Sequence, residues 1–254
     1  MSNVTNITNI AFYRFVKIAD PEALHVRLSS LCAELGLKGT ILLASEGING
    51  MLAGEDNNIS AILTHFELDP RFKDMLIKRS YSDAQPFKKI VIKVKEEVIS
   101  LGIPEVNPIE QTGKYIKPQE LRECLEKGED VILLDTRNAF EVEMGTFKNA
   151  INPQTTSFGK FPDFVKDKLG SIKDKKIVTF CTGGIRCEKA TSLMLKAGFN
   201  EVYQLEGGIL EYFAQTDGKY FDGSCFVFDE RISLDHKLQP AKKKGKAHAS
   251  PSIK

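Results

Sequence analysis

The segment 180–187, with the sequence Phe-Cys-Thr-Gly-Gly-Ile-Arg-Cys, constrains this chain more than any other part, because it sets a cysteine at the head of a tight loop. The preceding run, 176–180, is apolar and β-branched like a buried strand, and residues 188–196 have the period of an amphipathic helix. A loop between a strand and a helix collects backbone N–H groups at one point, and the helix N-terminus adds about half a positive charge. Both effects favour the thiolate of Cys181 over the thiol, so we predict a nucleophilic sulfur there.

The other residues of the loop are expected to hold the charge on this sulfur. Gly183 and Gly184 let the backbone curl without a Cβ clash, as a concave ring of N–H groups requires. Arg186 adds a permanent cation and is predicted to stabilise an anion at the site. The residues predicted to stabilise the thiolate through the loop are Thr182, Gly183, Gly184 and Ile185.

Several of these side chains also have a purely structural interpretation. Cysteine is among the most buried residue types, but two glycines, an arginine and a following helix argue against Cys181 as an inert core residue. Cys187 is either a packing residue or a resolving thiol that pairs with Cys181. Asp135 and Arg137 follow a buried strand, and they either orient the loop by a charge-assisted hydrogen bond or form a strand-end salt bridge.

The spacing of the loop separates two enzyme classes that use such a cysteine. Cysteine phosphatases place five residues between cysteine and arginine, which makes a ring that fits a tetrahedral phosphate. Here four residues lie between Cys181 and Arg186, and the smaller ring suits a sulfur atom bound to the cysteine. The loop therefore resembles that of the rhodanese-type sulfurtransferases. Residues 131–137, 145–147 and 150–152 resemble the opening signature of that family, with Thr146 where many rhodaneses have histidine.

Composition limits the remaining choices. The chain has 254 residues, 42% of them hydrophobic and 27% charged, which predicts an ordinary globular chain of two domains. A formal net charge of +1 gives no overall attraction to nucleic acid, so such binding depends on local patches. Five cysteines without disulfide-framework spacing and a polar N-terminus predict the reducing cytoplasm. No apolar run approaches the roughly twenty residues that a helix needs to span a bilayer, so we expect that this chain is not a membrane protein.

The pattern of residues 1–101 predicts the order β-α-β-β-α-β with one additional strand. This order is typical of a ferredoxin-like, or acylphosphatase-like, α+β domain. The glycine-rich hairpin turn at 45–50 either positions substrate or serves only the turn. The expected strands are 10–16, 39–44, 48–53, 73–79 and 89–94, and the expected helices are 21–35, with Asp20 as N-cap, and a segment capped by Asp56 that ends at residue 66.

The rest of the chain divides into a linker, a second domain and an extension. Residues 102–117 are rich in proline and polar residues and are predicted as the interdomain linker. Residues 118–218 alternate helix and strand, which predicts a rhodanese-like α/β domain with a central parallel sheet. The active loop then lies at the carboxyl end of a strand, where open α/β sheets bind ligands. Residues 219–254 form an aromatic-rich extension that ends in a basic tail predicted to be disordered. The elements expected in the second domain are helices at 119–127 and 161–169 and strands at 131–135, 177–180 and 202–205.

Three stretches together resemble one known family. The segments 46–50, 181–190 and 220–231 make the chain similar to the bacterial tRNA uridine hydroxylases, from about residue 10 to residue 235. The resemblance implies a cytoplasmic tRNA-modifying oxidoreductase of the monooxygenase type. Such an enzyme uses molecular oxygen to hydroxylate carbon 5 of the wobble uridine, U34, and gives 5-hydroxyuridine. Its cysteine loop is then a rhodanese site put to another use.

Two other functions stay open. A thiosulfate-type sulfurtransferase would carry a persulfide on Cys181, and a noncatalytic RNA- or protein-binding module would keep only the rhodanese shell. The intact cysteine, glycines and Arg186 argue against the second. For hydroxylation, either the Cys181 thiolate adds to C6 of uracil and makes C5 nucleophilic, or an oxidised cysteine donates oxygen.

A basic cluster in the first domain is the predicted tRNA-binding surface. Cations would bind phosphates and neighbouring aromatic rings would stack on the bases of an anticodon loop. A solvated lysine-rich strand face is the alternative interpretation. The cluster comprises Arg71, Lys73, Lys78, Arg79, Lys88, Lys89, Lys93 and Lys95, beside Phe72, Tyr81 and Phe87; the residues singled out for RNA binding are Arg79, Lys88, Lys89 and Lys93.

Molecular oxygen is the only co-substrate predicted, with no metal and no flavin. Many relatives continue after the segment Cys-Phe-Val-Phe-Asp into a Cys-x-x-Cys, which this chain lacks after Cys225. A structural zinc ion needs about four ligands, and Cys225 with His236 or His248 does not supply them. The sequence shows no flavin, haem or non-haem iron signature, and no feature that sets the oligomeric state.

Overall fold

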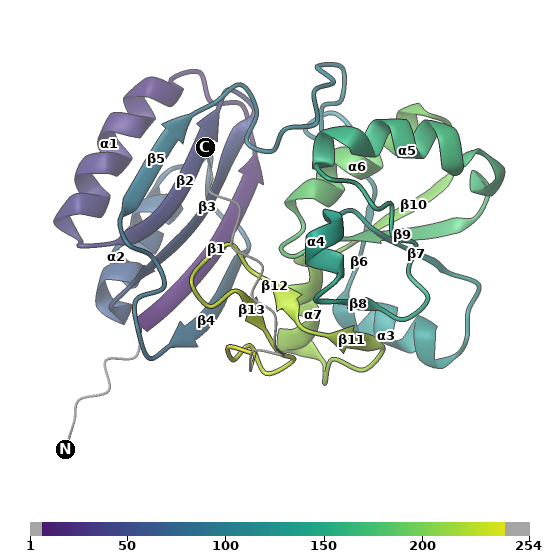
Figure 1. The fold of residues 1–254 in the computed structure, drawn as a ribbon. Coiled ribbons are helices and arrows are strands. Elements are labelled where there is room, and N and C mark those ends of the chain that lie inside the picture. Colours follow the sequence, from purple (N-terminus) through teal and green to yellow (C-terminus); the bar gives the residue numbers. More distant parts are fainter. Residues whose placement is uncertain (1–6, 242–254) are drawn as a thin grey trace.

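The structure, a computed structural model, describes residues 7–241 and shows an α+β domain followed by an α/β domain (Figure 1). The first domain has a five-stranded sheet in the order β4-β1-β3-β2-β5, in which β5 runs parallel to β2. This confirms the predicted ferredoxin-like arrangement and its additional strand. The elements are β1 (Ile7–Phe15), α1 (Pro21–Glu34), β2 (Lys38–Ala44), β3 (Gly47–Gly54), α2 (Asp56–Leu68), β4 (Ile77–Ser82) and β5 (Ile90–Val94).

Alternation of side chains along these strands gives the sheet two different faces. Ile10 and Phe12 of β1 point into the core under α1 and α2, where Phe12 packs on Phe66 with ring centroids 5.1 Å apart. Phe72 is also in this core and 1% exposed, so the prediction that it stacks on RNA bases is wrong. Ala11 and Tyr13 alternate with the core residues and lie on the other face, which is turned toward the second domain (Figure 1).

Three local predictions in this domain need correction. Asp20 occupies the N-cap position of α1 but makes no cap hydrogen bond, because its carboxylate accepts from Arg71 at 2.7 Å. Asp56 is the first helical residue of α2 rather than its cap, and it accepts from the Thr8 hydroxyl at 3.0 Å. The strand predicted at 73–79 begins only at Ile77, since the preceding residues form turns.

The second domain has a parallel sheet in the order β6-β10-β9-β7, as predicted for a rhodanese-like domain. Helices α3 and α7 cover one face and α5 and α6 cover the other. The main elements are β6 (Lys114–Ile116), α3 (Pro118–Glu126), β7 (Ile132–Asp135), α4 (Ala139–Val142), β8 (Gly145–Phe147), α5 (Phe161–Lys168), β9 (Lys176–Phe180), α6 (Ile185–Lys196), β10 (Glu201–Leu205) and α7 (Gly208–Gln215), with 3-10 helices at Phe158–Lys160 and Gly170–Ile172.

The segment 102–117, predicted as a linker, is not free of secondary structure. Its strand β6 pairs with β10 and forms the edge of the second sheet. A strand of three residues is too short to show a period in the sequence. Strand β6 therefore belongs to the sheet of the second domain. The domain limits given by the sequence stay predictions.

The extension returns across the junction of the two domains (Figure 1). Its strand β11 (Phe221–Gly223) pairs with β8, and β12 (Cys225–Phe226) pairs with β13 (Ser233–Leu234). Arg231 then reaches the first domain and donates to the Ser80 hydroxyl of β4 at 2.7 Å. The basic tail predicted to be disordered lies outside the described residues.

Buried polar contacts join the two domains near α6. The Tyr13 hydroxyl donates to Glu188 Oε1 at 3.0 Å, and Lys189 Nζ contacts Glu46 Oε1 at 2.8 Å and Glu97 Oε2 at 2.6 Å. Because Lys189 is 2% exposed, these ion pairs are shielded from water. These contacts hold α6, the helix after the cysteine loop, against the open face of the first sheet, which is the face not covered by α1 and α2. No helix between residues 7 and 241 is long and apolar enough to cross a membrane.

Candidate active site

Cys181 follows directly after β9 and lies where the parallel strands end. The helix after the loop, α6, begins at Ile185 and thus earlier than the sequence pattern predicts. Gly184 is the N-cap with a φ of 103°, a left-handed conformation that glycine adopts without strain. It turns its N–H group onto Cys181 Sγ at 3.0 Å. The order of strand, loop and helix is therefore as the sequence predicts, and only the start of the helix differs.

The surroundings of Cys181 stabilise the thiolate. Burial would raise the pKa of this thiol, but the Cys187 thiol, the Arg186 charge and the N–H groups of Arg186 and Gly184 lower the pKa to about 5. Thr182, Gly183 and Ile185 line the neighbouring cavity, and their role as donors to the sulfur stays a prediction. The Cys187 side chain is fully buried, and burial beside Cys181 raises the pKa of its thiol well above the ordinary value.

We expect this difference between the thiols to appear in their alkylation by iodoacetamide, which reacts with thiolates. Because the pKa of Cys181 is lowered to about 5, its rate should already be maximal at neutral pH. An ordinary thiol would reach only half of its maximal rate at about pH 8.5. Peptide mass spectrometry after timed alkylation measures each cysteine separately. If the alkylation rate of Cys181 rose with pH around the same midpoint as that of an ordinary thiol, the prediction of a thiolate at Cys181 would be wrong.

Arg186 does not reach freely into the cavity. Its two terminal nitrogens donate to the two carboxylate oxygens of Glu141 at 2.6 and 2.7 Å, and both side chains are almost fully buried. The pair raises the pKa of Arg186 and holds that of Glu141 below its usual range against the effect of burial. The arginine therefore acts on Cys181 from a fixed position, and its predicted role as an anion stabiliser stays a prediction.

Asp135 and Arg137 form a fully buried ion pair with Nη2 and Oδ2 2.7 Å apart. Arg137 also donates to the Gly145 carbonyl, and the Thr146 hydroxyl donates to Asp135. These bonds tie the end of β7 to β8 rather than to the cysteine loop. The contacts favour the salt-bridge interpretation over direct orientation of the loop.

Helix α7, which was not predicted from the sequence, contacts the cysteine loop through its first turn. The N–H groups of Ile209 and Leu210 donate to the carbonyls of Cys181 and Thr182 at 2.9 and 3.1 Å. Gly208 comes so close that a Cβ there would lie 2.5 Å from the Cys181 oxygen. A signal was present in the Gly-Gly pair at 207–208, since both glycines have positive φ.

We expect Gly208→Ala to destabilise the protein by roughly 1–3 kcal/mol, because the new Cβ combines a backbone clash with a positive φ. Gly183→Ala is the matched control, because the prediction that Gly183 avoids a Cβ clash is wrong: a Cβ there meets only the Lys78 side chain, at 3.9 Å. Its unfolding free energy should stay within about 0.5 kcal/mol of the wild type. Urea unfolding of both variants measures the difference, and equal midpoints would refute the steric role of Gly208.

A cavity of about 780 Å³ opens beside Cys181 between the two domains and the extension. The open face of the first sheet forms one wall with Tyr13 and Lys78, and the cysteine loop forms another. Val227 and Phe228 of the extension form a third. This volume is in the range of pockets that bind small molecules and nucleotides.

Two side chains of the first domain reach this loop, and their place was not predicted. Tyr13 lies against Gly184, where a Cβ would be 2.8 Å from the tyrosine oxygen. Lys78 is buried beside Gly183, although it was predicted as part of the basic cluster that binds tRNA. Both lie on strands far away in the chain, so no local pattern could join them to Cys181.

The four residues singled out for RNA binding lie on the first domain but do not form one cluster. Arg79 lines the cavity and contacts Asp56 at 3.7 Å. Lys88 is 89% exposed and lies 3.9 Å from Glu230, and Lys89 is also exposed. Lys93 lies on the edge strand β5 in register with Leu42 of β2. Their role in RNA binding stays a prediction.

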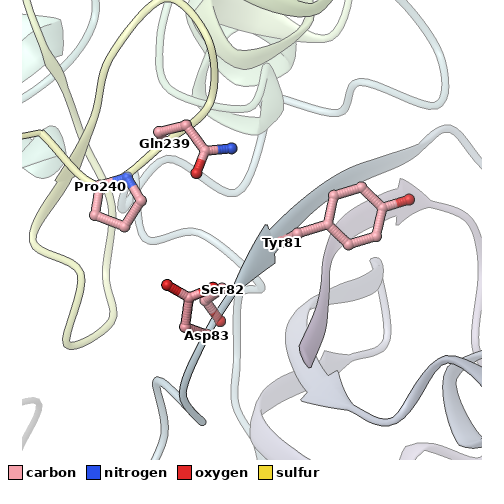
Figure 2. A pocket seen from close by; sticks show the side chains of 5 residues that line it. All are labelled: Tyr81, Ser82, Asp83, Gln239 and Pro240. Atoms are coloured by element: carbon pink, nitrogen blue, oxygen red, sulfur yellow. The ribbon is translucent and has the colours of Figure 1, made fainter. Parts of the chain in front are cut away.

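A smaller pocket of about 210 Å³ lies away from Cys181, at the end of β4. Figure 2 shows Ser82 and Asp83 near Gln239 and Pro240, with the Tyr81 ring turned away from them. None of these residues lines the larger cavity. Within residues 7–241, no group of three or more His, Cys, Asp or Glu side chains could hold a metal ion.

Two family models match different parts of the chain. Residues 7–98 match the UPF0176 acylphosphatase like domain, and residues 117–215 match the rhodanese-like domain. A tRNA uridine(34) hydroxylase from Bordetella parapertussis is 46% identical over 237 residues, which cover 93% of this chain and 99% of that protein. One from Acaryochloris marina is 42% identical over 241 residues, 94% of this chain and 77% of that protein. The solution structure of a rhodanese-like domain from Anabaena matches at 21% identity with a TM-score of 0.38, over 55% of this chain and 94% of that domain.

Proposed function

The chain belongs to the tRNA uridine(34) hydroxylase family, and from this premise we propose that it hydroxylates carbon 5 of the wobble uridine with Cys181 as the reactive group. The observation that carries the proposal is a buried cysteine whose pKa is lowered to about 5, on the wall of a cavity of about 780 Å³. A perturbed titratable group in a cleft is typical of active sites. Molecular oxygen is the proposed oxidant: one of its atoms becomes the new hydroxyl group, and the other leaves as water with two electrons and two protons from an external reductant.

The proposed role of Cys181 is nucleophilic addition to uracil. The thiolate attacks C6, so that the Sγ–C6 bond forms and the C5=C6 π bond breaks. The electron pair moves through C5 onto the C4 carbonyl oxygen as an enolate. No proton has to leave the sulfur first, because the low pKa keeps it ionised. C5, the atom that receives the hydroxyl group, becomes nucleophilic.

The substrate is tRNA, and we propose that the anticodon loop presents its uridine to the cavity. Unstacked bases of single-stranded loops can turn out into a protein pocket. Phe228 lines the cavity and is 38% exposed, so its ring can stack on such a base. Arg79, Lys88, Lys89 and Lys93 are the proposed phosphate contacts. The proposed compartment is the cytoplasm, where tRNA is modified.

The experiment that tests this function is nucleoside mass spectrometry on total tRNA from cells lacking the protein, with and without the plasmid-borne wild type. We expect 5-hydroxyuridine and its derivatives to disappear without the protein and to return with the plasmid. The match of residues 117–215 to rhodanese-like domains favours a sulfurtransferase as the second candidate. Unchanged 5-hydroxyuridine with loss of a thiolated nucleoside would support that candidate and overturn the hydroxylase.

A further inference from the structure

Lys78 is a buried cation at the active-site cavity. It lies on β4 in register with Ala11 of β1, on the sheet face turned away from α1 and α2. The residue is only 6% exposed, yet it lines the cavity together with Cys181. The last two carbons of its side chain, Cδ and Cε, lie 3.9 and 4.0 Å from the position that a Cβ on Gly183 would occupy. The lysine of the first domain therefore contacts the loop of the second.

The ammonium group of Lys78 has unused hydrogen-bonding capacity. Within the described residues, Nζ has no hydrogen-bond partner. Its nearest aromatic neighbour is the Tyr13 ring, with the centroid 4.8 Å from Nζ. An ammonium has three donors and no acceptor, and the ring face satisfies it only electrostatically. Burying a cation without a partner is costly, and methionine would fill similar space at lower cost.

The charged groups around Lys78 indicate what kind of ligand its ammonium group could bind. Burial lowers the pKa of this ammonium to about 8, while the opposing charges of Cys181, Glu211 and Glu188 raise it. The Glu188 carboxylate is already occupied by the hydroxyls of Tyr13, Tyr115 and Thr112. Within the described residues, the donors of Lys78 therefore have no acceptor, on a side chain that lines the same cavity as Cys181. A hydrogen-bond acceptor that gains negative charge during the reaction satisfies this geometry.

We propose that Lys78 is a catalytic residue of this site, whose ammonium group donates a hydrogen bond to the C4 carbonyl oxygen of the bound uracil and stabilises the negative charge that forms there. The inference rests on the proposed function. When the Cys181 thiolate adds to C6, the electron pair of the C5=C6 bond ends on this oxygen, and the fixed positive charge lowers the energy of the enolate. Lys78 itself keeps all its bonds in this step, and the proton it shares with the oxygen stays on the nitrogen.

Lys78→Met is the variant that tests the proposal, with Lys78→Arg as the charge-retaining variant. In cells lacking the wild type, we expect Lys78→Met to lower 5-hydroxyuridine in tRNA by about 10²-fold or more, as for loss of an oxyanion donor. Lys78→Arg should retain a larger share of the product. The control is Lys17→Met, which removes the same charge from an exposed position outside the cavity and should hydroxylate like the wild type.

Two measurements on the purified full-length variants separate a catalytic from a structural or RNA-binding role. The midpoint of thermal unfolding of Lys78→Met should equal or exceed that of the wild type, because an unpaired buried cation is removed. Binding of tRNA in a mobility-shift assay should be unchanged, since a buried lysine does not contact phosphates. Loss of product together with a lower unfolding midpoint in both Lys78 variants would assign a structural role and overturn the proposal, as would loss of tRNA binding.

The same complementation experiment distinguishes a failure of the Lys78 proposal from a failure of the proposed hydroxylase function. If the wild type restores 5-hydroxyuridine and Lys78→Met restores it equally, only the role of Lys78 is refuted. If the wild type restores none, the hydroxylase function fails, and the uracil-binding role of Lys78 fails with it. Full product with the wild type and a loss confined to Lys78→Met, with normal folding and tRNA binding, supports the proposal.

Discussion

Cys181→Ser is expected to reduce 5-hydroxyuridine in tRNA to the level of cells that lack the protein. A serine hydroxyl stays protonated near neutral pH, whereas the pKa of Cys181 is lowered to about 5 and supplies a thiolate. The exchange removes the nucleophile without removing much volume, so the fold should persist. Nucleoside mass spectrometry of tRNA from the complemented deletion strain measures the loss, which we expect to be about 10³-fold or greater.

Two other cysteines serve as controls for this result. Cys124→Ser changes a thiol on α3, outside the cavity, and should leave hydroxylation near the wild-type level. Cys187→Ser distinguishes the two interpretations of that residue, since a resolving thiol is needed for turnover and a packing residue is not. Wild-type amounts of 5-hydroxyuridine in the Cys181→Ser strain would refute the role of the cysteine outright.

Glu141→Gln is expected to cause the largest loss of stability among single changes at the site. The carboxylate holds the Arg186 guanidinium with two short hydrogen bonds, and both groups are almost fully buried. Removing one partner leaves a buried charge uncompensated, which costs roughly 3–5 kcal/mol. Because the negative charge near Cys181 also disappears, we expect the pKa of the Cys181 thiol to fall further in the folded protein.

Urea unfolding and the pH dependence of Cys181 alkylation measure these two effects separately. Glu143→Gln is the matched control, since Glu143 is exposed and lies at the end of the same short helix, α4. Its unfolding free energy should stay within about 0.5 kcal/mol of the wild type. If Glu141→Gln unfolded at the same urea concentration as Glu143→Gln, the buried ion pair would contribute nothing to stability.

The fold was predictable where hydrophobic periods are long. The two strands joined by the turn predicted at 45–47 and the alternation of helix and strand after residue 118 appear in the structure nearly as expected. Short or irregular elements were missed: β6 has three residues and α4 has four. The strand expected at 73–79 begins only at Ile77, because the chain first makes turns after α2 that place Phe72 in the core.

Only the part of the candidate site that lies within the cysteine loop could be predicted from the sequence. The relation of Cys181, Gly184 and Arg186 follows from their spacing, and the structure places them together. Glu141 and Lys78 come from other elements, and their approach depends on the packing of two domains. Lys78 could be read from the sequence only as one more cation of a basic cluster, because its burial against Tyr13 is a tertiary property.

The most direct test of the central claim is the source of the oxygen in the product. Cells of the deletion strain that express the wild-type protein can be grown under ¹⁸O₂, and their tRNA nucleosides analysed by mass spectrometry with Cys181→Ser cells in parallel. We predict that 5-hydroxyuridine at the wobble position carries one ¹⁸O atom in the wild-type cells and is absent from the Cys181→Ser cells. Unlabelled 5-hydroxyuridine, or labelled product in the Cys181→Ser cells, would contradict an oxygen-dependent hydroxylation at this cysteine.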